Sequence, residues 1–582
     1  MGNYFDIIIK NATIIDGSGS PRKTGDLGIT DGRIVRIGTV EGSAKRSIDG
    51  SGKIVCPGFV DPHNHADLFI LDVPLTPVLA RQGITTYACG NCGISVAPHG
   101  RGEYARDLSR TFGFSLHGGW DSFEEWLDIV EGEGISLNMI PFAGHNAIRS
   151  SILGSEFSRP STAEEMKALG LLTEQVLEEG AHGITLGLDG GTPGFFADFS
   201  ELVELGRIIG RYNGILMPHT RHHQYNWAAS KSPRDKGYGI YYGPPSEAFL
   251  GRYHGHAEAV EIAENSGVRL HIAHFSIPYL VHQPHPAWLD EELARAALEA
   301  IIDSARARGV DVSFDVIPNI ESIATERPII DSFLFDGITR DEAAARIGDH
   351  AFQDRILERI RAGRMKFFWI HPLVDPYWFD CFRILSCRDR DVEGRNLGEI
   401  VREKGTGRIM DTVYDLSFRI LFDLVCRDPE ATWAAVLDKR GTGLSTLLQH
   451  PFAMPCTDLV VPVIQENKKA IYGISPYTAN IFPDYIRRFV REEKDLTLEE
   501  GIRKATSLPA EYLFGLSDRG LLKEGYWADV VLFDYENLRG TADFSDPVKP
   551  PRGIDYVIVN GEVIVENGNH NGGRPGKVLR RE

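Results

Sequence analysis

The sequence predicts an α/β protein centred on a (β/α)8 TIM-like barrel, with a small β-sandwich domain formed by both chain ends and an inserted subdomain. Three observations predict this fold: apolar strands alternate with helical patterns through the middle of the chain, both ends are rich in short strands, and a histidine pair closes the first strand of the middle region. Repeated strand and helix units indicate a parallel sheet with crossover helices. Seven or eight such units favour a closed barrel over an open sheet.

Both chain ends have the pattern of short antiparallel strands. The β-rich runs cover residues 6–10, 13–15, 27–29 and 33–37 near the start, and 528–534 and 556–565 near the end. Asp-Gly pairs between such runs are a strong hairpin signal. Because the ends of a domain tend to lie close together, we expect one sandwich built from residues 1–57 and 515–582.

The middle of the chain, residues 58–514, carries the strands of the predicted barrel. Its apolar runs cover residues 54–60, 83–87, 137–142, 183–186, 214–218, 269–273 and 310–314. Helical patterns lie between them, one over residues 162–179 with Ser161 or Thr162 as its N-terminal cap. We expect the inserted subdomain at about residues 320–448.

Length and charge limit the class of protein. A chain of 582 residues exceeds what one core usually holds, so we expect a large catalytic domain with at least one smaller unit. The 81 acidic side chains outnumber the 62 basic ones, and the net charge of −19 opposes binding to phosphate backbones and anionic membranes. We therefore expect no nucleic-acid partner.

The location and redox state can also be predicted. No apolar run approaches the roughly 18 residues that a membrane span requires, and the first residues lack the basic and apolar regions of a signal peptide. The seven cysteines are scattered over the chain, which opposes a disulfide framework. We expect a soluble, cytoplasmic protein with no membrane partner.

The first barrel strand ends at a histidine pair, His63 and His65. Side chains at i and i+2 of an extended segment point to the same side, so both imidazoles can bind one metal ion. Two solvated histidines are the alternative, because His-x-His is common by accident. Further candidate ligands at later strand ends favour the metal site.

Polar groups follow the later predicted strands. They are Cys89 and Cys92, then His145, His219, His274 and Asp458. Barrel enzymes place their chemistry at these carboxyl ends of the strands. Cys89 and Cys92 could instead be a redox pair, which the missing thioredoxin-like context disfavours. We expect His271 and His282 to be packing or surface residues.

These motifs resemble the amidohydrolase superfamily and, within it, the D-aminoacylase (N-acyl-D-amino-acid deacylase) group. The similar segments are residues 58–67, 83–86, 90–95, 144–145, 218–221, 273–274 and 450–458, with a similar tail at 573–580. They follow in order over nearly the whole chain. The Asn91-Cys92-Gly93 element separates this group from relatives that use a carboxylated lysine as the metal bridge.

The resemblance implies a site for one or two Zn²⁺ ions. Cys92, His219 and His274 would hold the tighter zinc, and His63 and His65 would form the second, weaker site together with Cys92. A thiolate and two imidazoles supply three protein ligands and leave a position open for water, which bound zinc activates near neutral pH.

The resemblance also implies catalytic roles. Asp458 would take the proton of the attacking water as general base and deliver it to the leaving nitrogen as general acid. His145 would lie near the metal and donate to the substrate or to the oxyanion.

The chain departs from that group where the substrate's carboxylate is held. The usual His-Lys pair is replaced by His274, Phe275 and Ser276, and residues 188–194 replace the usual aromatic and proline segment. Losing a cation and a tyrosine weakens the grip on a free α-carboxylate. Ser276, Arg383 and Arg388 are therefore candidate substrate-binding residues, the two arginines as substitutes for the missing carboxylate clamp.

Residues 221–257 and 320–448 are rich in aromatic side chains, and they could form lids, line a pocket or simply pack. If they line the pocket, the small-molecule substrate is bulky and aromatic. The leading hypothesis is hydrolysis of an N-acyl amino acid or a bulkier N-acylated compound.

Three alternatives stay open: hydrolysis of a cyclic amide or lactone, a metal-assisted carbon–carbon lyase or decarboxylase, and a non-catalytic metal-binding protein. The last is disfavoured because a purely structural zinc site is closed by four ligands and needs no base such as Asp458. The sequence also leaves open whether the chain forms a homo-oligomer.

Overall fold

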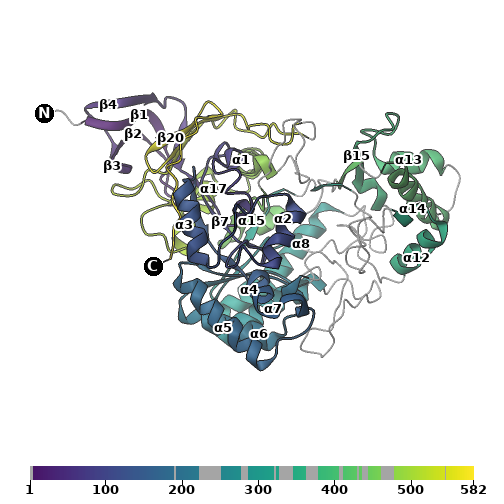
Figure 1. The fold of residues 1–582 in the computed structure, drawn as a ribbon. Helices are drawn as coiled ribbons and strands as arrows, with labels where there is room; N and C mark the ends of the chain where they lie inside the picture. The colour runs from purple at the N-terminus through teal and green to yellow at the C-terminus, as the bar shows by residue number, and fades with distance from the viewer. Residues whose placement is uncertain are drawn as a thin grey trace.

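The computed structural model describes most of the chain. The described residues are 4–188, 192–221, 251–276, 286–319, 323–326, 345–361, 378–405, 410–428, 431–435, 443–460, 478–543 and 546–581. In Figure 1 the strands of both chain ends lie on the left, the barrel helices lie at the centre, and the helices of the insertion lie on the right.

The centre of the molecule is a ring of parallel strands. They are β6 (Phe59–Asp61), β7 (Ile84–Cys89) and β8 (Asn138–Pro141) in one sheet, and β9 (Ala143–Gly144), β10 (Gly183–Gly187), β11 (Ile215–His219), β12 (Arg269–Ile272), β13 (Val312–Val316) and β17 (Ala453–Pro455) in the other. Only Phe142 separates β8 from β9, so these two segments form one broken strand. A parallel bridge between Asn64 and Leu459 joins the first strand to the last. The predicted (β/α)8 barrel is confirmed.

The barrel strands form where the sequence is continuously apolar, because helices cover their outer side. Every residue of β7 and β10 is buried. The covering helices include α3 (Phe123–Glu133), α4 (His145–Leu153), α5 (Ala163–Glu178), α6 (Phe199–Arg211) and α7 (Gly251–Ser266). The cap of α5 is Thr162, whose hydroxyl accepts from the Glu165 amide at 3.2 Å in a capping box.

The strand predicted over residues 54–60 is two strands. Its first part, β5 (Ile54–Pro57), pairs with β18 (Val530–Phe533), whereas β6 pairs with β7. Gly58 separates them, and a side chain at that position would come within 2.1 Å of the Thr85 hydroxyl. Glycine, which has no Cβ, is therefore required at the point where the chain passes from the outer sheet into the barrel.

Both chain ends contribute to one nine-stranded sheet. Its other strands are β1 (Tyr4–Ile14), β2 (Lys23–Thr30), β3 (Arg33–Gly38), β4 (Ser43–Asp49), β19 (Ile554–Val559), β20 (Glu562–Glu566) and β21 (Asn569–His570). Ile9 and Leu27 from one end share a core with Val530 and Ile558 from the other. The prediction that both ends build one β domain is thus confirmed, while the exact domain boundaries stay a prediction.

The insertion has a core of its own. It contains β14 (Ile323–Glu326), β15 (Phe382–Ser386) and β16 (Thr432–Ala435) in an antiparallel sheet, with α12 (His350–Arg361), α13 (Leu397–Lys404) and α14 (Met410–Arg427) beside them. Trp378 and Phe418 stack with ring centroids 4.5 Å apart inside this core. Trp378 and Phe379, from the aromatic-rich insertion, therefore pack. Residues 222–250 and 362–377, which hold most of the other predicted aromatics, lie outside the described residues, as does His282.

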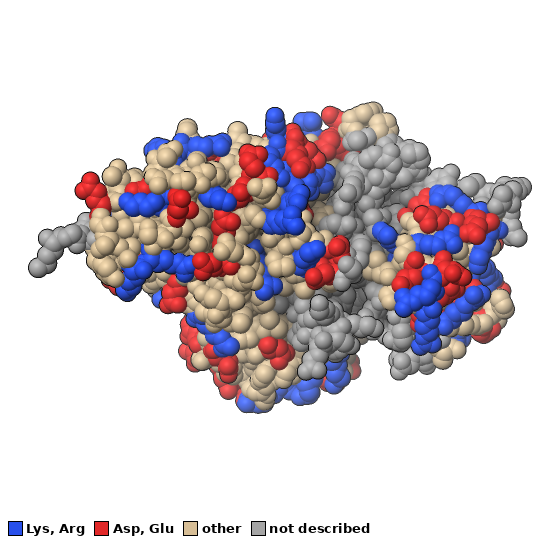
Figure 2. All heavy atoms as spheres, turned by 90° about the horizontal axis from the view of Figure 1, so that it is seen from above, with Lys and Arg blue, Asp and Glu red and all other residues tan. Residues whose placement is uncertain are grey.

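Two surface properties bear on possible partners. Acidic and basic side chains alternate over the face seen in Figure 2. No helix in the described ranges combines the length and the apolar character needed to cross a membrane.

Candidate metal centre

Two groups of metal-ligand atoms meet at the carboxyl ends of the barrel strands, with atoms within 4.8 Å of one another in each group. The first group is His63, His65, Cys92 and Asp458, and the second is Cys92, His219 and His274. Cys92 belongs to both groups. The structure thus brings together all five histidine and cysteine ligands that the sequence analysis named, and it adds Asp458 to one group.

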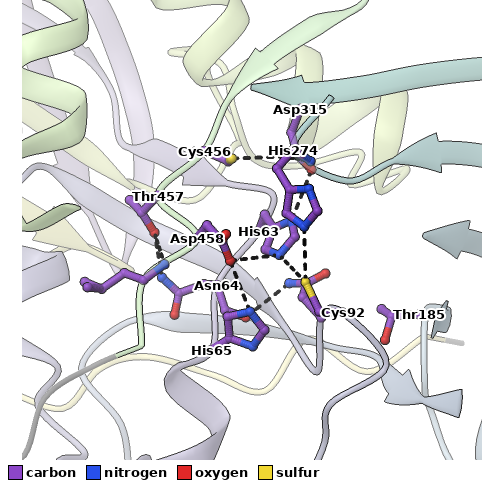
Figure 3. Close-up of polar contacts among 12 residues, drawn as sticks. His63, Asn64, His65, Cys92, Thr185, His274, Asp315, Cys456, Thr457 and Asp458 are labelled. Carbon is purple, nitrogen blue, oxygen red and sulfur yellow. Dashed lines mark hydrogen bonds and ion pairs between the residues drawn. The ribbon is translucent and has the colours of Figure 1, made fainter. Parts of the chain in front are cut away.

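The Cys92 thiol faces His63 of the first group and His274 of the second (Figure 3). Its Sγ is 3.2 Å from His63 Nε2 and 3.4 Å from His274 Nε2. On the other side, Asp458 Oδ1 is 3.2 Å from His63 Nε2 and 3.1 Å from His65 Nε2. Several lone pairs therefore converge on a small volume, as a metal ion requires.

The backbone at this site is strained. Cys92, His274 and Asp458 have φ values of 54°, 34° and 49°, in the left-handed region that residues with a side chain rarely adopt. Such conformations cost on the order of 1–3 kcal/mol each and persist where the surroundings hold them. They cluster at functional sites, because the strain aims side chains that a regular strand end would direct elsewhere.

The loop that carries Cys92 is held by its neighbours in β10 and α4. The Gly93 amide donates to the Thr185 hydroxyl at 3.0 Å, and the Asn146 amide donates to the Gly93 carbonyl at 3.1 Å. A side chain at Gly187 would come within 2.2 Å of the Cys92 carbonyl oxygen. The thiol is therefore placed by close backbone packing.

Asp61 connects the first and last barrel strands under the histidine pair. Its carboxylate accepts from the Thr457 hydroxyl at 2.6 Å, from the Thr457 amide at 3.0 Å and from Asn64 Nδ2 at 3.0 Å. The Asp458 amide donates to the His63 carbonyl at 3.0 Å. His63, His65 and Asp458 are thereby fixed relative to one another.

The electrostatics of the donor groups suit a cation. Burial raises the pKa of the Cys92 thiol, but His63, His274 and His219 outweigh it and hold that pKa well below its ordinary value. Burial opposes protonation of His65, but Asp458 and Cys92 raise its pKa to about 10. A thiol and a carboxyl group that favour their ionised forms thus lie beside the imidazoles of His63 and His65. Thiolate with imidazole is the donor set that zinc prefers.

Asp315 belongs to this site and was not named in the sequence analysis. It lies in β13, fully buried, in contact with His63 Nδ1 and with the His274 amide (Figure 3). The signal was present, since Asp315 directly follows the predicted strand over residues 310–314, as the other site residues follow theirs.

Comparisons with known proteins show what this chain is similar to. The model of the amidohydrolase family matches residues 471–565. N-acyl-D-glutamate deacylase from Alcaligenes xylosoxydans xylosoxydans is 27% identical over 100% of this chain and 98% of its own length. D-aminoacylase from the same organism is 26% identical over 99% of this chain and 98% of its own length.

The fold comparison agrees. The crystal structure of N-acyl-D-glutamate deacylase from Bordetella bronchiseptica, complexed with zinc and a phosphonate inhibitor, has a TM-score of 0.68 and 25% identity over 100% of both chains. A crystal structure of D-aminoacylase has a TM-score of 0.69 and 25% identity, covering 99% of this chain and 100% of that one. Over its full length the chain is therefore similar to amidohydrolases of the D-aminoacylase group.

His145 is the first residue of α4, outside both donor groups. Its Nε2 lies 3.0 Å from Glu201 Oε1, and Arg149 Nε donates to the same oxygen at 3.0 Å. Burial opposes ionisation of Glu201, but its hydrogen bond to His145 and the nearby Arg149 lower its pKa to about 2. A catalytic role for His145 stays a prediction.

The predicted substrate-binding residues lie in two places. Ser276 follows His274 by two residues, and its carbonyl oxygen is 3.3 Å from His256 Nε2. Arg383 and Arg388 lie in the insertion. Arg383 Nε donates to the Gly394 carbonyl at 3.0 Å, and Arg388 Nε is 3.6 Å from Asp428 Oδ1.

Within the described ranges, the contacts of Arg383 and Arg388 stay inside the insertion and do not include the donor groups. Their role toward a substrate, like that of Ser276, stays a prediction.

Cys89 and His271, two further residues considered in the sequence analysis, are both buried. Burial raises the pKa of the Cys89 thiol well above its ordinary value, which disfavours a redox role beside Cys92. His271 is fully buried, with Nε2 3.0 Å from Asp315 Oδ2. It is a packing residue beneath the donor groups.

Proposed function

We propose that this protein is a zinc-dependent amidohydrolase that hydrolyses the C–N amide bond of an N-acyl-D-amino acid or of a bulkier N-acylated compound. One observation carries the proposal: among the described residues the two donor groups share Cys92, one of them offers three protein ligands, and the other includes the partly exposed Asp458 carboxylate. A purely structural zinc site is closed by four ligands and has no use for a base beside it.

The residues present fit zinc. Cys92, His219 and His274 would hold one ion, and His63 and His65 would share Cys92 in holding a second. In such sites zinc lowers the pKa of a water molecule toward about 7 and polarises a carbonyl oxygen.

Asp458 would move the proton during hydrolysis. Its side chain is 26% exposed, whereas that of His63 is 0% exposed, so Asp458 is the group of this pair that can meet water and substrate. Burial raises its pKa, but the neighbouring His63 and His65 hold that pKa well below its ordinary value. An ionised carboxylate can take the proton of the attacking water and pass it to the leaving nitrogen.

The relatives support the substrate class. N-acyl-D-glutamate deacylase and D-aminoacylase match this chain over nearly its full length, as does N-acyl-D-aspartate deacylase from Alcaligenes xylosoxydans xylosoxydans, 27% identical over 99% of this chain and 95% of its own length. The names of these relatives share an N-acyl or D-amino-acid substrate, and the two deacylases differ in the side chain. We therefore propose the D configuration and leave the side chain to the experiment.

A cyclic amide is the second candidate substrate. D-hydantoinase from Ralstonia pickettii is 41% identical over 85 residues, which are 15% of this chain and 18% of that protein. Attack on a ring amide uses the same donor groups and the same base, so only the substrate separates the two proposals.

The test is a substrate panel with zinc-loaded protein: N-acetyl D- and L-amino acids, bulkier N-acyl and aryl amides, and hydantoins. We expect amine release from D-substrates that is lost in Cys92→Ala and in Asp458→Ala. Turnover of hydantoins alone would replace the first proposal by the second. No turnover of any amide, with zinc bound, would contradict both.

The cytoplasmic location and any homo-oligomer stay predictions of the sequence.

A further inference from the structure

We propose that Asp315 is a positioning residue that couples the two metal-binding groups, because its one carboxylate contacts a ligand of each. The inference rests on the proposed metal site and goes beyond it. It assigns a role to a residue that belongs to neither donor group.

The Asp315 carboxylate is fully buried and contacts four neighbours, of which Figure 3 labels His63, His274 and Cys456. Its Oδ2 is 3.4 Å from His63 Nδ1 and 3.0 Å from His271 Nε2. Its Oδ1 accepts from the His274 amide at 2.6 Å and from the Cys456 thiol at 3.0 Å. These neighbours come from segments after β6, in and after β12, and after β17.

The contact with His63 orients a ligand of the first group. His63 Nε2 faces the Cys92 thiol, so Nδ1 faces Asp315. A carboxylate near Nδ1 favours the tautomer with its proton on that nitrogen. The lone pair of Nε2 is then free for a metal.

The contact with His274 acts on the backbone. His274 has a φ of 34°, and its amide donates to Asp315 Oδ1 at 2.6 Å. The following amide, of Phe275, donates to the Asp315 carbonyl at 2.8 Å. Asp315 thereby holds the strained turn that directs His274 toward Cys92, a ligand of the second group.

Two partners fix the carboxylate itself. His271 contacts Asp315 Oδ2 through Nε2 and the Ser313 hydroxyl, 2.8 Å away, through Nδ1. The Cys456 thiol donates to the other carboxylate oxygen, Oδ1. Both oxygens therefore have contacts that hold the carboxylate plane in one orientation. Cys92 joins the two groups from one side and Asp315 joins them from the other.

The test is zinc affinity of the metal-free full-length protein, measured by competition with a chromophoric chelator. We expect Asp315→Asn to weaken both binding steps by about 10–100-fold, the usual effect of losing a partner of metal ligands. His65→Gln, in contrast, should weaken one step only. The matched control is Asp529→Asn, which removes a buried carboxylate at the other end of the barrel and should leave both steps unchanged.

A spectroscopic readout separates positioning from general loosening of the fold. Cobalt(II) in place of zinc should show shifted ligand-field and thiolate charge-transfer bands in Asp315→Asn and unshifted bands in Asp529→Asn. If Asp315→Asn does not fold, His271→Gln serves as the second variant, because it frees the carboxylate without touching a donor. It should weaken both steps in the same direction.

The outcomes are distinct. Weakening of only one step, or of neither, in the folded Asp315 or His271 variant would overturn the coupling and leave the proposed function intact. Absence of zinc binding by the unaltered protein would overturn the proposed function itself.

Discussion

The two ends of the barrel both carry buried polar clusters, and they are built in opposite ways. At the carboxyl ends of the strands, donor atoms face one another on a strained backbone at Cys92, His274 and Asp458. At the amino ends, each oxygen of the buried Asp529 has donors: the Asn560 amide at 2.8 Å on one, and Asn138 Nδ2 at 3.1 Å with Arg519 on the other.

This difference shows how one fold separates stability from chemistry. Both carboxylate oxygens of Asp529 are paired with groups of the chain, and these contacts join the outer sheet to the first residue of β8. The donor groups around Cys92 place thiol, imidazole and carboxyl groups close together, and a bound cation would be the common partner of their lone pairs. Barrel enzymes generally divide their two ends in this way.

Removal of the thiol should have the largest effect. Because Cys92 serves both donor groups, Cys92→Ala should lower zinc affinity by more than about 100-fold, since even outer partners of metal ligands are worth about 10–100-fold. Amide hydrolysis should fall to background. Chelator competition and bound-zinc content measure the loss, with Cys89→Ala as the control that keeps its zinc. Tight zinc binding by Cys92→Ala would show that the donor groups at the carboxyl ends do not depend on this thiol.

Removal of the proposed base should have the next largest effect. Asp458→Asn keeps the shape of the side chain but cannot take a proton, so we expect kcat to fall by about 10²–10⁴-fold. The group of Cys92, His219 and His274 does not include Asp458 and should still hold zinc. Steady-state kinetics with zinc analysis of the same sample separates the two effects. A variant with full zinc and unchanged kcat would show that another group moves the proton.

A substitution at the amino ends of the barrel strands should change the stability of the protein and leave its zinc binding and activity unchanged. Asp529→Asn leaves Arg519 buried without its anion, which typically costs about 3–5 kcal/mol of unfolding free energy. Zinc affinity and kcat of the folded variant should be unchanged. Urea unfolding monitored by circular dichroism gives the first quantity. If Asp529→Asn lowers kcat while the unfolding free energy stays the same, the two ends are not separate in function.

The ligands could be predicted from the sequence because their signal is local. His63, His219 and His274 each follow an apolar strand, and parallel strands of a barrel bring their carboxyl ends to one rim. The helix over residues 163–178 has equally local signals at its capping box. The strand pattern therefore indicates that these side chains lie together, and the resemblance to the D-aminoacylase group assigned them, with Cys92, as zinc ligands.

Partners that are distant in sequence could not be predicted. The carboxylate of Asp61 accepts from Thr457, 396 residues away, and no local pattern indicates such a pair. Glu201 meets His145 across two helices for the same reason. The division of the first predicted strand at Gly58 depends on the space left by Thr85, which periodicity does not encode.

The smallest predicted effect is a pH dependence at the amino end, where His182 precedes β10. Burial lowers the pKa of His182 from 6.5 to about 4, the Leu579 carbonyl opposes this shift, and Arg581 adds to it. Because the folded pKa is below the unfolded one, the unfolded chain binds more protons between these values. Stability should therefore fall as the pH drops from about 6.5 to about 4.

A shift of this size corresponds to about 3 kcal/mol once the pH is below both values. His182→Gln cannot titrate, so its unfolding free energy should lack this contribution. The donor-group histidines titrate in both proteins, and the difference between the two proteins cancels them. Urea midpoints at pH 7.5, 5.5 and 4.5 measure that difference, which should shift in favour of His182→Gln as the pH falls. If the difference in unfolding free energy between the two proteins stays constant across these pH values, burial does not hold His182 neutral. His182 would then accept a proton in the folded state as readily as in the unfolded chain.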